Sequence, residues 1–395
     1  MDKKFRVLMV AACPFPFPRG TPIRIQRMAE SLAINGHEVH VATYHLGEHQ
    51  VDTPYTIHRI IRLPFYNKLD PGPSVIKLLL VDPLLTIKLT RLIAKYKFDI
   101  IYAHHFEGFI CALPSRLLVK RPVVFDIHTL LEAELPYYGP SRTQGLLSRI
   151  GKIFDTTLPV YADHVVGISE EIVNKVSREA HVPPEKISLI SNGVELELFM
   201  TAQPDRDRLD NKGIILAYAG NFARYQGIET MLKALSLLKE TNQGITLKLI
   251  SKNDLSAYQP LLRELGIERQ INHIQVPFSE LPQQLANADI LVNPRFASAG
   301  YPLKLLNYMA AGKPVITMSG TSHKTIHGQT GWVVEGSAPA DLAVGIQYLI
   351  DHPDLREQLG KNARRYVEEN FMWVEKTRQL ELIFEGLVPM PSGYH

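Results

Sequence analysis

Short apolar segments alternate with longer helical patterns along the whole chain, and this alternation limits the possible folds more than any other feature. The apolar segments lack polar alternation, so each is expected to be a strand buried on both faces. Such strands, separated by helices, form parallel sheets, and two successive series predict two doubly wound α/β domains. The expected strands are 6–12, 38–44, 99–105, 122–128, 164–169 and 187–191, then 214–220, 246–251, 273–277, 289–294 and 314–318.

A polar, charged segment separates the two series. The segment 201–213, "TAQPDRDRLDNKG", contains proline and is typical of a linker. We therefore expect a first domain over 1–200 and a second over 214–370, which suits a chain of 395 residues. Ligands of doubly wound sheets bind at the carboxyl ends of the strands, so the site is expected in a cleft between two facing sheets.

Charge, cysteines and hydropathy exclude several classes of protein. The formal net charge of +3 argues against a dedicated nucleic-acid binder. Cys13 and Cys111 make no disulfide framework and fit a reducing compartment, where we expect both as small buried side chains. The apolar start, 5–13, reads as a buried strand and not as a signal peptide. Three charged residues and a proline keep 75–89 from spanning a membrane. A soluble or peripheral protein is expected.

Two loops that follow strands have features of anion sites. After the first strand, Gly20 precedes Thr21, a good N-cap, and Pro22, a good first helical residue. A helix N-terminus at a sheet edge favours an anion, although a plain connection explains it equally. In the second domain Gly220 and Gly227 bracket a loop that contains Arg224. Such a loop can wrap a phosphate, but this signal alone is weak.

The stretch 299–315, "AGYPLKLLNYMAAGKPV", predicts a short helix between two buried strands. Pro302 suits its first position, and Gly312 its end. Lys304 and Asn307 share one face three residues apart. The helix dipole and the lysine together favour a diphosphate, and the amide can bind hydroxyl groups. The alternative is an ordinary pair of surface residues, and the short helix between buried strands favours the functional interpretation.

The order and spacing of several motifs resemble a family-4 glycosyltransferase with the GT-B architecture of two Rossmann-like domains, over almost the whole chain. The last helical segment, 371–395, resembles the one that crosses back to the first domain in that fold. The motifs are the glycine loop after the first strand, "IYAHHFEG", "DIHT", "ADHVVGIS", "ISLISNGVELELF", "AYAGNFARYQGIETMLKAL", "ADILVNP", "GYPLKLLNYMAAGKPVI" and "GQTGWVV".

The resemblance implies transfer of a hexose-type sugar, with retention of configuration, from a UDP- or GDP-sugar to a hydroxyl of a glycan or lipid-linked acceptor. The donor would bind the second domain and the acceptor the first. No protein nucleophile, metal or other cofactor is implied, because cationic and N–H groups stabilise the departing diphosphate. The sequence likewise has no clustered metal-ligand motif. A cytoplasmic protein is expected.

The resemblance also supplies the expected site residues. His128 follows a strand at a carboxyl edge and corresponds to a sugar-contacting histidine. His104 and His105 follow another strand, and the sequence does not decide between them; Glu132 and Glu134 are either acceptor contacts or solvated. The expected catalytic residues are His128, Arg224 and Lys304; the donor-binding residues are Gly20, Asn221, Gln226, Gly227, Pro277, Gly300, Tyr301, Pro302 and Asn307; the acceptor-side residues are Arg19, His104 and Glu132.

The chain departs from the family pattern at the donor site. Asn221 and Gln226 stand where the family has an arginine and a lysine. Ala299 and Asn307 replace two glutamates, and Arg19 replaces the first glycine of a pair. We expect the positive charge to be redistributed to Arg19, Arg224 and Lys304. The alternative is a non-catalytic GT-B module that binds a sugar or a partner. A sugar-nucleotide epimerase is a second rival, against which the match around Lys304 argues.

The segment 59–97 carries eight basic residues against two acids. Lys88, Arg91 and Lys95 share one helical face, with leucines and isoleucines elsewhere. This pattern suits a peripheral contact with anionic lipids on the inner membrane face, but also an ordinary helix packed on a sheet, which we slightly favour.

Overall fold

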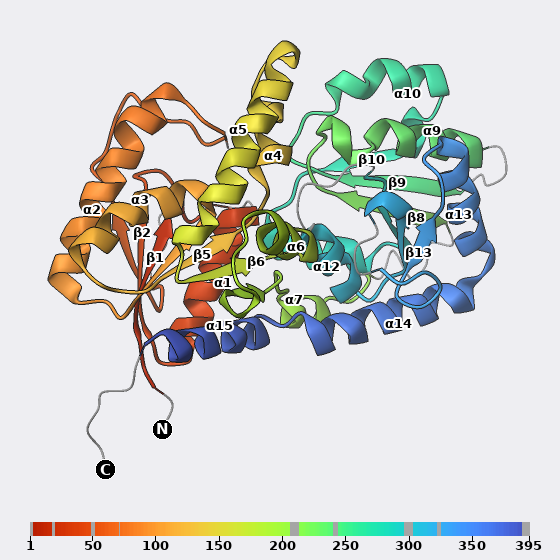
Figure 1. Ribbon diagram of the computed structural model, residues 1–395. Coiled ribbons are helices and arrows are strands. Elements are labelled where there is room, and N and C mark those ends of the chain that lie inside the picture. Colours follow the sequence, from red (N-terminus) through yellow and green to blue (C-terminus); the bar gives the residue numbers. More distant parts are fainter. Residues whose placement is uncertain are drawn as a thin grey trace. The chain divides into compact units, whose positions relative to one another are not determined.

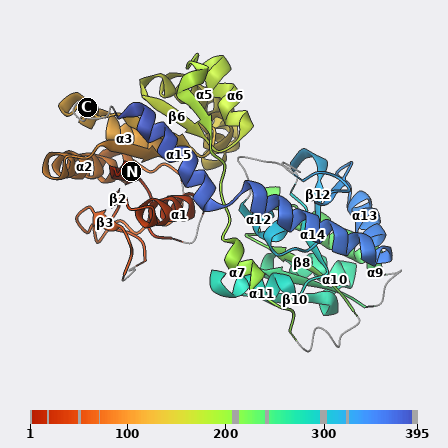
Figure 2. The ribbon, with the colours of Figure 1, turned by 90° about the horizontal axis from the view of Figure 1, so that it is seen from below.

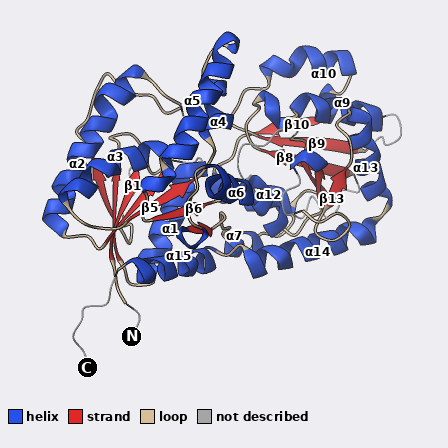
Figure 3. Cartoon of the chain, in the orientation of Figure 1, coloured by secondary structure: helices blue, strands red, loops and turns tan. Residues whose placement is uncertain are grey.

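The computed structural model of the protein describes residues 3–17, 20–48, 52–70, 72–205, 213–239, 244–295, 303–321 and 325–388 (Figures 1 and 3). The chain forms two compact units. Unit 1 consists of Met1–Asn192 together with Trp373–His395, and unit 2 consists of Gly193–Met372. None of the described helices is long and apolar enough to cross a bilayer.

Unit 1 contains a seven-stranded sheet whose neighbouring strands are all parallel, as predicted. The strand order is β3-β2-β1-β4-β5-β6-β7. Strand β3 was not among the predicted strands, because three of its four residues are polar and all four are exposed or partly exposed at the sheet edge. The strands are β1 (Arg6–Ala11), β2 (Glu38–Thr43), β3 (Thr56–Arg59), β4 (Ile100–His104), β5 (Val123–Ile127), β6 (His164–Gly167) and β7 (Ile187–Leu189).

Helices cover both faces of this sheet. Helices α2 and α3 pack together over a core that includes Phe109 and Phe125, whose rings stack 4.2 Å apart. The other face is covered by α1 and α15, which also pack together (Figure 2). The helices are α1 (Gly20–Ile34), α2 (Asp82–Tyr96), α3 (His105–Leu118), α4 (Leu131–Glu134), α5 (Gln144–Thr157), α6 (Glu170–Glu179) and α15 (Trp373–Leu387); a π-helical turn, Lys77–Val81, precedes α2.

Unit 2 contains a six-stranded sheet, again with parallel neighbours, in the order β10-β9-β8-β11-β12-β13. Its short edge strand β13 was not among the expected strands. The strands are β8 (Ile214–Ala219), β9 (Ile245–Ile250), β10 (Ile271–Ile274), β11 (Ile290–Asn293), β12 (Val315–Met318) and β13 (Trp332–Val334). The helices are α7 (Leu196–Met200), α9 (Ile228–Lys239), α10 (Gln259–Leu265), α11 (Leu281–Ala286), α12 (Leu303–Ala310), α13 (Pro339–Asp351) and α14 (Pro353–Asn370).

The chain passes from unit 1 to unit 2 earlier than the polar segment 201–213. Val194, Leu196 and Phe199 are buried in the core of unit 2, together with residues of α12. These apolar side chains therefore draw 193–200 into unit 2, although the sequence analysis assigned them to the first domain. The return occurs between Met372 and Trp373, because Trp373 is buried in the core of unit 1.

Candidate active site

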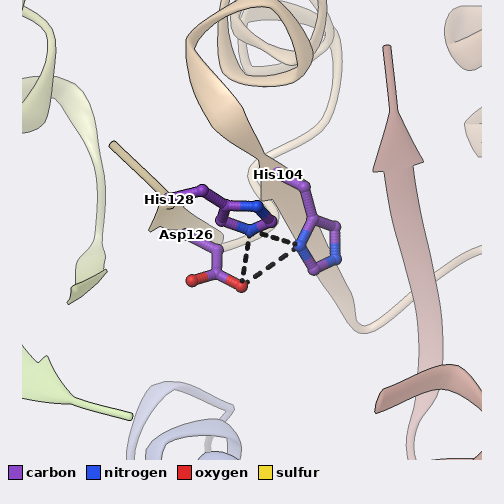
Figure 4. Close-up of side chains that lie close together, drawn as sticks. All are labelled: His104, Asp126 and His128. Atoms are coloured by element: carbon purple, nitrogen blue, oxygen red, sulfur yellow. Dashed lines mark hydrogen bonds and ion pairs between the residues drawn. The ribbon is translucent and has the colours of Figure 1, made fainter. Parts of the chain in front are cut away.

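Three buried polar side chains meet at the carboxyl ends of β4 and β5 in unit 1 (Figure 4). His104 is the last residue of β4, Asp126 lies near the end of β5, and His128 follows that strand directly. One carboxylate oxygen of Asp126, Oδ2, lies 3.1 Å from Nδ1 of His104 and 3.2 Å from Nε2 of His128. The fold thus brings the two predicted histidines together around an aspartate that the sequence analysis did not select.

The same carboxylate is also bound by Arg24 of α1. Nε and Nη2 of Arg24 donate to the two Asp126 oxygens at 2.8 and 3.1 Å, and the hydroxyl of Tyr102 donates at 2.6 Å. Arg24 is 1% exposed and Asp126 is fully buried. Although burial alone would raise the pKa of Asp126, the charge of Arg24 and the histidine hydrogen bonds hold it well below its usual range.

His104, Asp126 and His128 have the composition of a possible metal site, since their ligand atoms lie within 4.8 Å of one another. The Arg24 guanidinium, however, already binds both oxygens of the Asp126 carboxylate. A metal ion there would face a buried positive charge across its own ligand. The surroundings therefore fit a buried ion pair with hydrogen-bonded histidines better than a metal centre.

His128 is held as a neutral imidazole. Burial lowers its pKa to about 4, against the opposing influence of Asp126. Its Nε2–H faces the Asp126 carboxylate, so Nδ1 accepts a hydrogen bond from the Thr21 hydroxyl at 3.0 Å. Helix α1 begins at the exposed residue Gly20. Thr21 therefore lies in the first turn of α1, and its hydroxyl contacts His128.

The neighbouring His105 belongs to a different network. It has a φ of +60° and lies 2.5 Å from Glu107 and 3.6 Å from Glu134. Burial opposes protonation, but these two carboxylates raise the His105 pKa to about 10. Lys77 extends the network to Glu107 at 2.6 Å. His104 and His105 are thus distinguished by the structure: only His104 contacts Asp126.

Glu132 in α4 forms an ion pair with Lys175 of α6. Both residues line a surface cavity of about 400 Å³ that also includes Leu130 and Asn174. This cavity lies between the helices that follow β5 and β6. The structure therefore places Glu132 at a surface depression of unit 1, and none of the Asp126 cluster residues lines it.

In unit 2, Lys304 occupies the first turn of α12. Its ammonium group donates to the side-chain oxygen of Gln226 and, at 3.4 Å, to the hydroxyl of Tyr218, and it lies 4.5 Å from the centre of the Tyr218 ring. Just beyond β11, buried Arg295 lies over the Tyr225 ring at 5.1 Å. Burial first, and then the charge of Arg295, lower the pKa of Lys304 to about 7.

The loop after β8 is held in place by backbone contacts. Gly227 has a φ of +74°, and a Cβ there would lie 2.0 Å from the carbonyl oxygen of Pro294, so the loop passes close to the end of β11. Asn221 is exposed and its side-chain oxygen accepts the N–H of Ala223, which makes it a turn former. Tyr308 of α12 binds both the N–H and the carbonyl of Ala219.

Other predicted residues lie apart from these contacts or outside the described part of the chain. Arg224 is exposed on the loop surface, and it is Gln226 that contacts Lys304. Pro277 is exposed after β10, and Asn307 is half-buried one turn after Lys304. Arg19, Ala299, Gly300, Tyr301 and Pro302 lie outside the described residues.

Sequence reasoning missed the residues that hold the predicted ones. Asp126 is an acid inside a buried strand, and Arg24 lies between two isoleucines on the buried face of α1. Charges at such positions are seldom buried without a partner, which is a usable signal. Arg295 lies two residues after the buried strand β11, and a charged residue at this position could have been identified as a candidate.

Two family models together match most of the chain: "Glycosyltransferase Family 4" matches residues 18–198, and "Glycosyl transferases group 1" matches residues 199–366. Among curated proteins, the chain is similar to a D-inositol 3-phosphate glycosyltransferase of Corynebacterium glutamicum, with 25% identity over 74% of this chain and 73% of that protein.

Solved structures share the fold. A sucrose-phosphate synthase of Thermosynechococcus elongatus has a TM-score of 0.80 and 20% identity, over 97% of this chain and 99% of the other. The Anabaena protein HepE, solved in complex with UDP-glucose, has a TM-score of 0.72 and 15% identity, over 97% of this chain and 100% of the other. This likeness confirms the predicted architecture of two parallel-sheet, Rossmann-like units.

Proposed function

Because the chain belongs to the family-4 glycosyltransferases, enzymes of the GT-B fold, we propose that it transfers a sugar from a UDP- or GDP-sugar to a hydroxyl of a glycan or lipid-linked acceptor, with retention of configuration. The donor binds unit 2 and the acceptor binds unit 1. The complexes of HepE with UDP and with UDP-glucose support a nucleotide-sugar donor.

The observation that carries this proposal is the position of Lys304. A partly buried ammonium group, held by a neutral amide and a phenol, lies in the first turn of α12 under the influence of Arg295. Two neighbouring cations beside a helix N-terminus favour a dianionic leaving group. Lys304 and Arg295 would stabilise the charge that develops on the diphosphate, and a phosphate oxygen would take the acceptor proton.

The proposed contribution of unit 1 is His128. Both ring nitrogens have partners, Nε2 in Asp126 and Nδ1 in Thr21, so a sugar hydroxyl at the carboxyl edge of the sheet would bind the Thr21 oxygen or replace Thr21 as the donor to Nδ1. Glu132 and the other carboxylate and amide side chains that line its cavity suit a hydroxyl-rich acceptor, because carboxylates and amides accept hydrogen bonds from hydroxyl groups.

The proposal includes a peripheral contact with anionic lipids on the cytoplasmic face of a membrane. Arg91 and Lys95 are exposed on α2, and Val75, Leu78 and Leu79 are exposed just before it. Exposed basic and apolar side chains in one helical segment favour contact with anionic headgroups. Flotation with vesicles of phosphatidylglycerol and phosphatidylcholine tests this. Binding that requires the anionic lipid supports the contact, and an absence of binding removes it.

The transferase proposal is tested with a panel of nucleotide sugars, by scoring release of nucleoside diphosphate, thermal shift and the anomeric configuration of the product. Lys304→Ala should lower transfer by about 100-fold or more while the melting temperature stays nearly unchanged. Lys361→Ala, which changes an exposed lysine of α14, is the matched control and should keep full activity. Nucleotide-sugar binding without turnover, with acceptors supplied, would instead support the non-catalytic module.

A further inference from the structure

The geometry points to Asp126 and Arg24 as positioning residues that tie the tautomer and orientation of His128 to the segment 190–192, where the chain leaves unit 1. This inference rests on the proposed role of His128 in transfer. Neither residue is placed to touch a substrate: Arg24 is 1% exposed and Asp126 is fully buried. Their role would be exerted through His128.

Arg24 holds the departing segment through its remaining donors. Nη1 donates to the carbonyl of Ser191 at 3.1 Å and to the side-chain oxygen of Asn192 at 3.3 Å. Nη2 donates to the carbonyl of Ile190 at 3.0 Å. Together with the two bonds to Asp126, these contacts use all five N–H groups of the guanidinium. The segment and the carboxylate are thus bound by one rigid, planar group, which a lysine could not replace.

Asp126 passes this constraint to His128. Its Oδ2 accepts from Arg24 and lies 3.2 Å from Nε2 of His128, so a shift of the guanidinium moves the acceptor of the histidine proton. With Nε2 protonated, Nδ1 is the atom that accepts from Thr21. Loss of the carboxylate position would free the ring to exchange tautomers, and a wrong tautomer is costly in catalysis.

The returning segment of the chain also lies near Arg24. Lys376 belongs to α15 and is 8% exposed. Burial and then the charge of Arg24 lower the pKa of Lys376. The same helix packs on α1, where Thr377 lies 3.8 Å from the sulfur of Met28. Arg24 is therefore close to the chain both where it leaves unit 1 and where it re-enters.

The test measures the His128 tautomer directly, by ¹⁵N NMR of the imidazole rings in the full-length protein, with the His128 signals assigned from their loss in His128→Gln. The wild type should show the Nε2–H tautomer throughout the neutral pH range. Asn192→Ala removes one acceptor of Arg24 at the departing segment. It should shift the His128 ring signals and lower kcat by about 10-fold, with little change in donor KM.

Ser188→Ala is the matched control. It removes a hydrogen bond between β7 and His164, in the same strand region, without touching Arg24. It should leave the His128 signals and kcat unchanged. Arg24→Lys serves as a second variant. It keeps the positive charge but loses the planar guanidinium that binds both oxygens of Asp126, so it should shift the His128 signals further than Asn192→Ala.

The outcomes separate this inference from the proposed function. If Asn192→Ala and Arg24→Lys both leave the His128 signals unchanged in a folded protein, the positioning role is overturned. A wild-type ring in the Nδ1–H tautomer overturns it equally. If the signals shift while transfer is unaffected, the connection stands and the assigned role of His128 in transfer fails.

Discussion

The ammonium group of Lys304 is bound by the neutral amide of Gln226, which lies 78 residues earlier in the chain. Gln226 stands where the family carries a lysine. A neutral amide therefore replaces a cation at this position, and it binds Lys304, which supplies the positive charge instead. No ion pair among the residues that the structure describes involves Lys304, and Arg295 lowers its pKa further. With no carboxylate among its described partners to hold its proton, the Lys304 side chain exchanges between the amine and the ammonium form near neutral pH, and an incoming anion favours the ammonium form.

Binding of a diphosphate to this site should be coupled to uptake of a proton. Because the pKa of Lys304 is about 7, its side chain is mostly the neutral amine at pH 8 when no ligand is bound. A bound diphosphate favours the ammonium form and raises this pKa. We expect uptake of about one proton per UDP at pH 8, and an affinity that weakens by up to about 10-fold per pH unit above 7.

Calorimetry at pH 8 in two buffers of different ionisation enthalpy measures this proton uptake. Lys304→Arg is the control, because arginine stays protonated and should bind UDP without taking up a proton. Binding of UDP by the wild type with no proton exchange would contradict the prediction.

His128 and His58 should affect acid stability alike but activity differently. Burial lowers the pKa of both to about 4, with His40 contributing at His58. Between pH 6.5 and 4 the unfolded chain binds more protons than the folded one, so the free energy of unfolding falls as the pH falls. For His128 the full effect is about 3 kcal/mol.

Urea unfolding at pH 7 and pH 5 should show a smaller loss of stability in His128→Gln and in His58→Gln than in the wild type. Only His128→Gln should lose transfer activity, because His58 lies on the edge strand β3. Equal rates for the two variants would argue against a role of His128 in the reaction.

Gly227→Ala should be more destabilising than an alanine at another glycine with the same backbone conformation. Gly227 and Gly328 have φ values of +74° and +69°. A Cβ at Gly328 meets no atom within 4 Å, whereas at Gly227 it would lie 2.0 Å from the Pro294 carbonyl oxygen. For Gly328→Ala we expect the free energy of unfolding to fall by about 1 kcal/mol, from conformational strain alone. For Gly227→Ala we expect it to fall by about 3 kcal/mol or more.

Urea unfolding of the two alanine variants measures this difference. UDP binding should weaken in Gly227→Ala, since the displaced loop carries Gln226. Equal losses of stability would show that the loop can move away from Pro294 at no cost.

Tyr308→Phe should loosen the same loop from the side of α12. The hydroxyl accepts the Ala219 N–H at 2.6 Å and donates to the Ala219 carbonyl at 3.2 Å, in a buried setting. Its removal leaves both backbone groups without their partner, at a cost of about 2 kcal/mol in the free energy of unfolding. Tyr348→Phe, at a tyrosine 40% exposed, should cost a few tenths of a kcal/mol. Thermal unfolding compares the two, and equal melting temperatures would count against this anchoring.

The strands could be predicted where burial on both faces leaves a continuous apolar run, as in β4 and β5. Strand β3 was not predicted because an edge strand with one partly exposed face carries polar residues. Strand β13 was not predicted because three residues make too short a pattern. The boundary between the units near Val194 could not be predicted from the polar composition of 201–213. The boundary depends instead on which core buries the apolar residues that precede this segment.

The candidate site was predictable to the extent that its residues follow strands. His128 and Lys304 could be selected by position and motif. Their partners could not, because a contact such as that of Arg24 with Asp126 joins residues 102 positions apart and depends on how α1 packs. The expected charge of Arg224 lies on the loop surface, and Arg295, at the end of a buried strand, lies near Lys304 instead.

The assignment of α15 to unit 1 has a consequence for biosynthesis. Trp373, Leu380 and Phe384 share a core with Phe5 and Met9, so this core needs segments made both before and after unit 2. During translation, unit 2 emerges from the ribosome as one uninterrupted stretch and can assemble at once. The earlier-made sheet must wait, with the part of one apolar face beside α1 uncovered, until α15 leaves the exit tunnel.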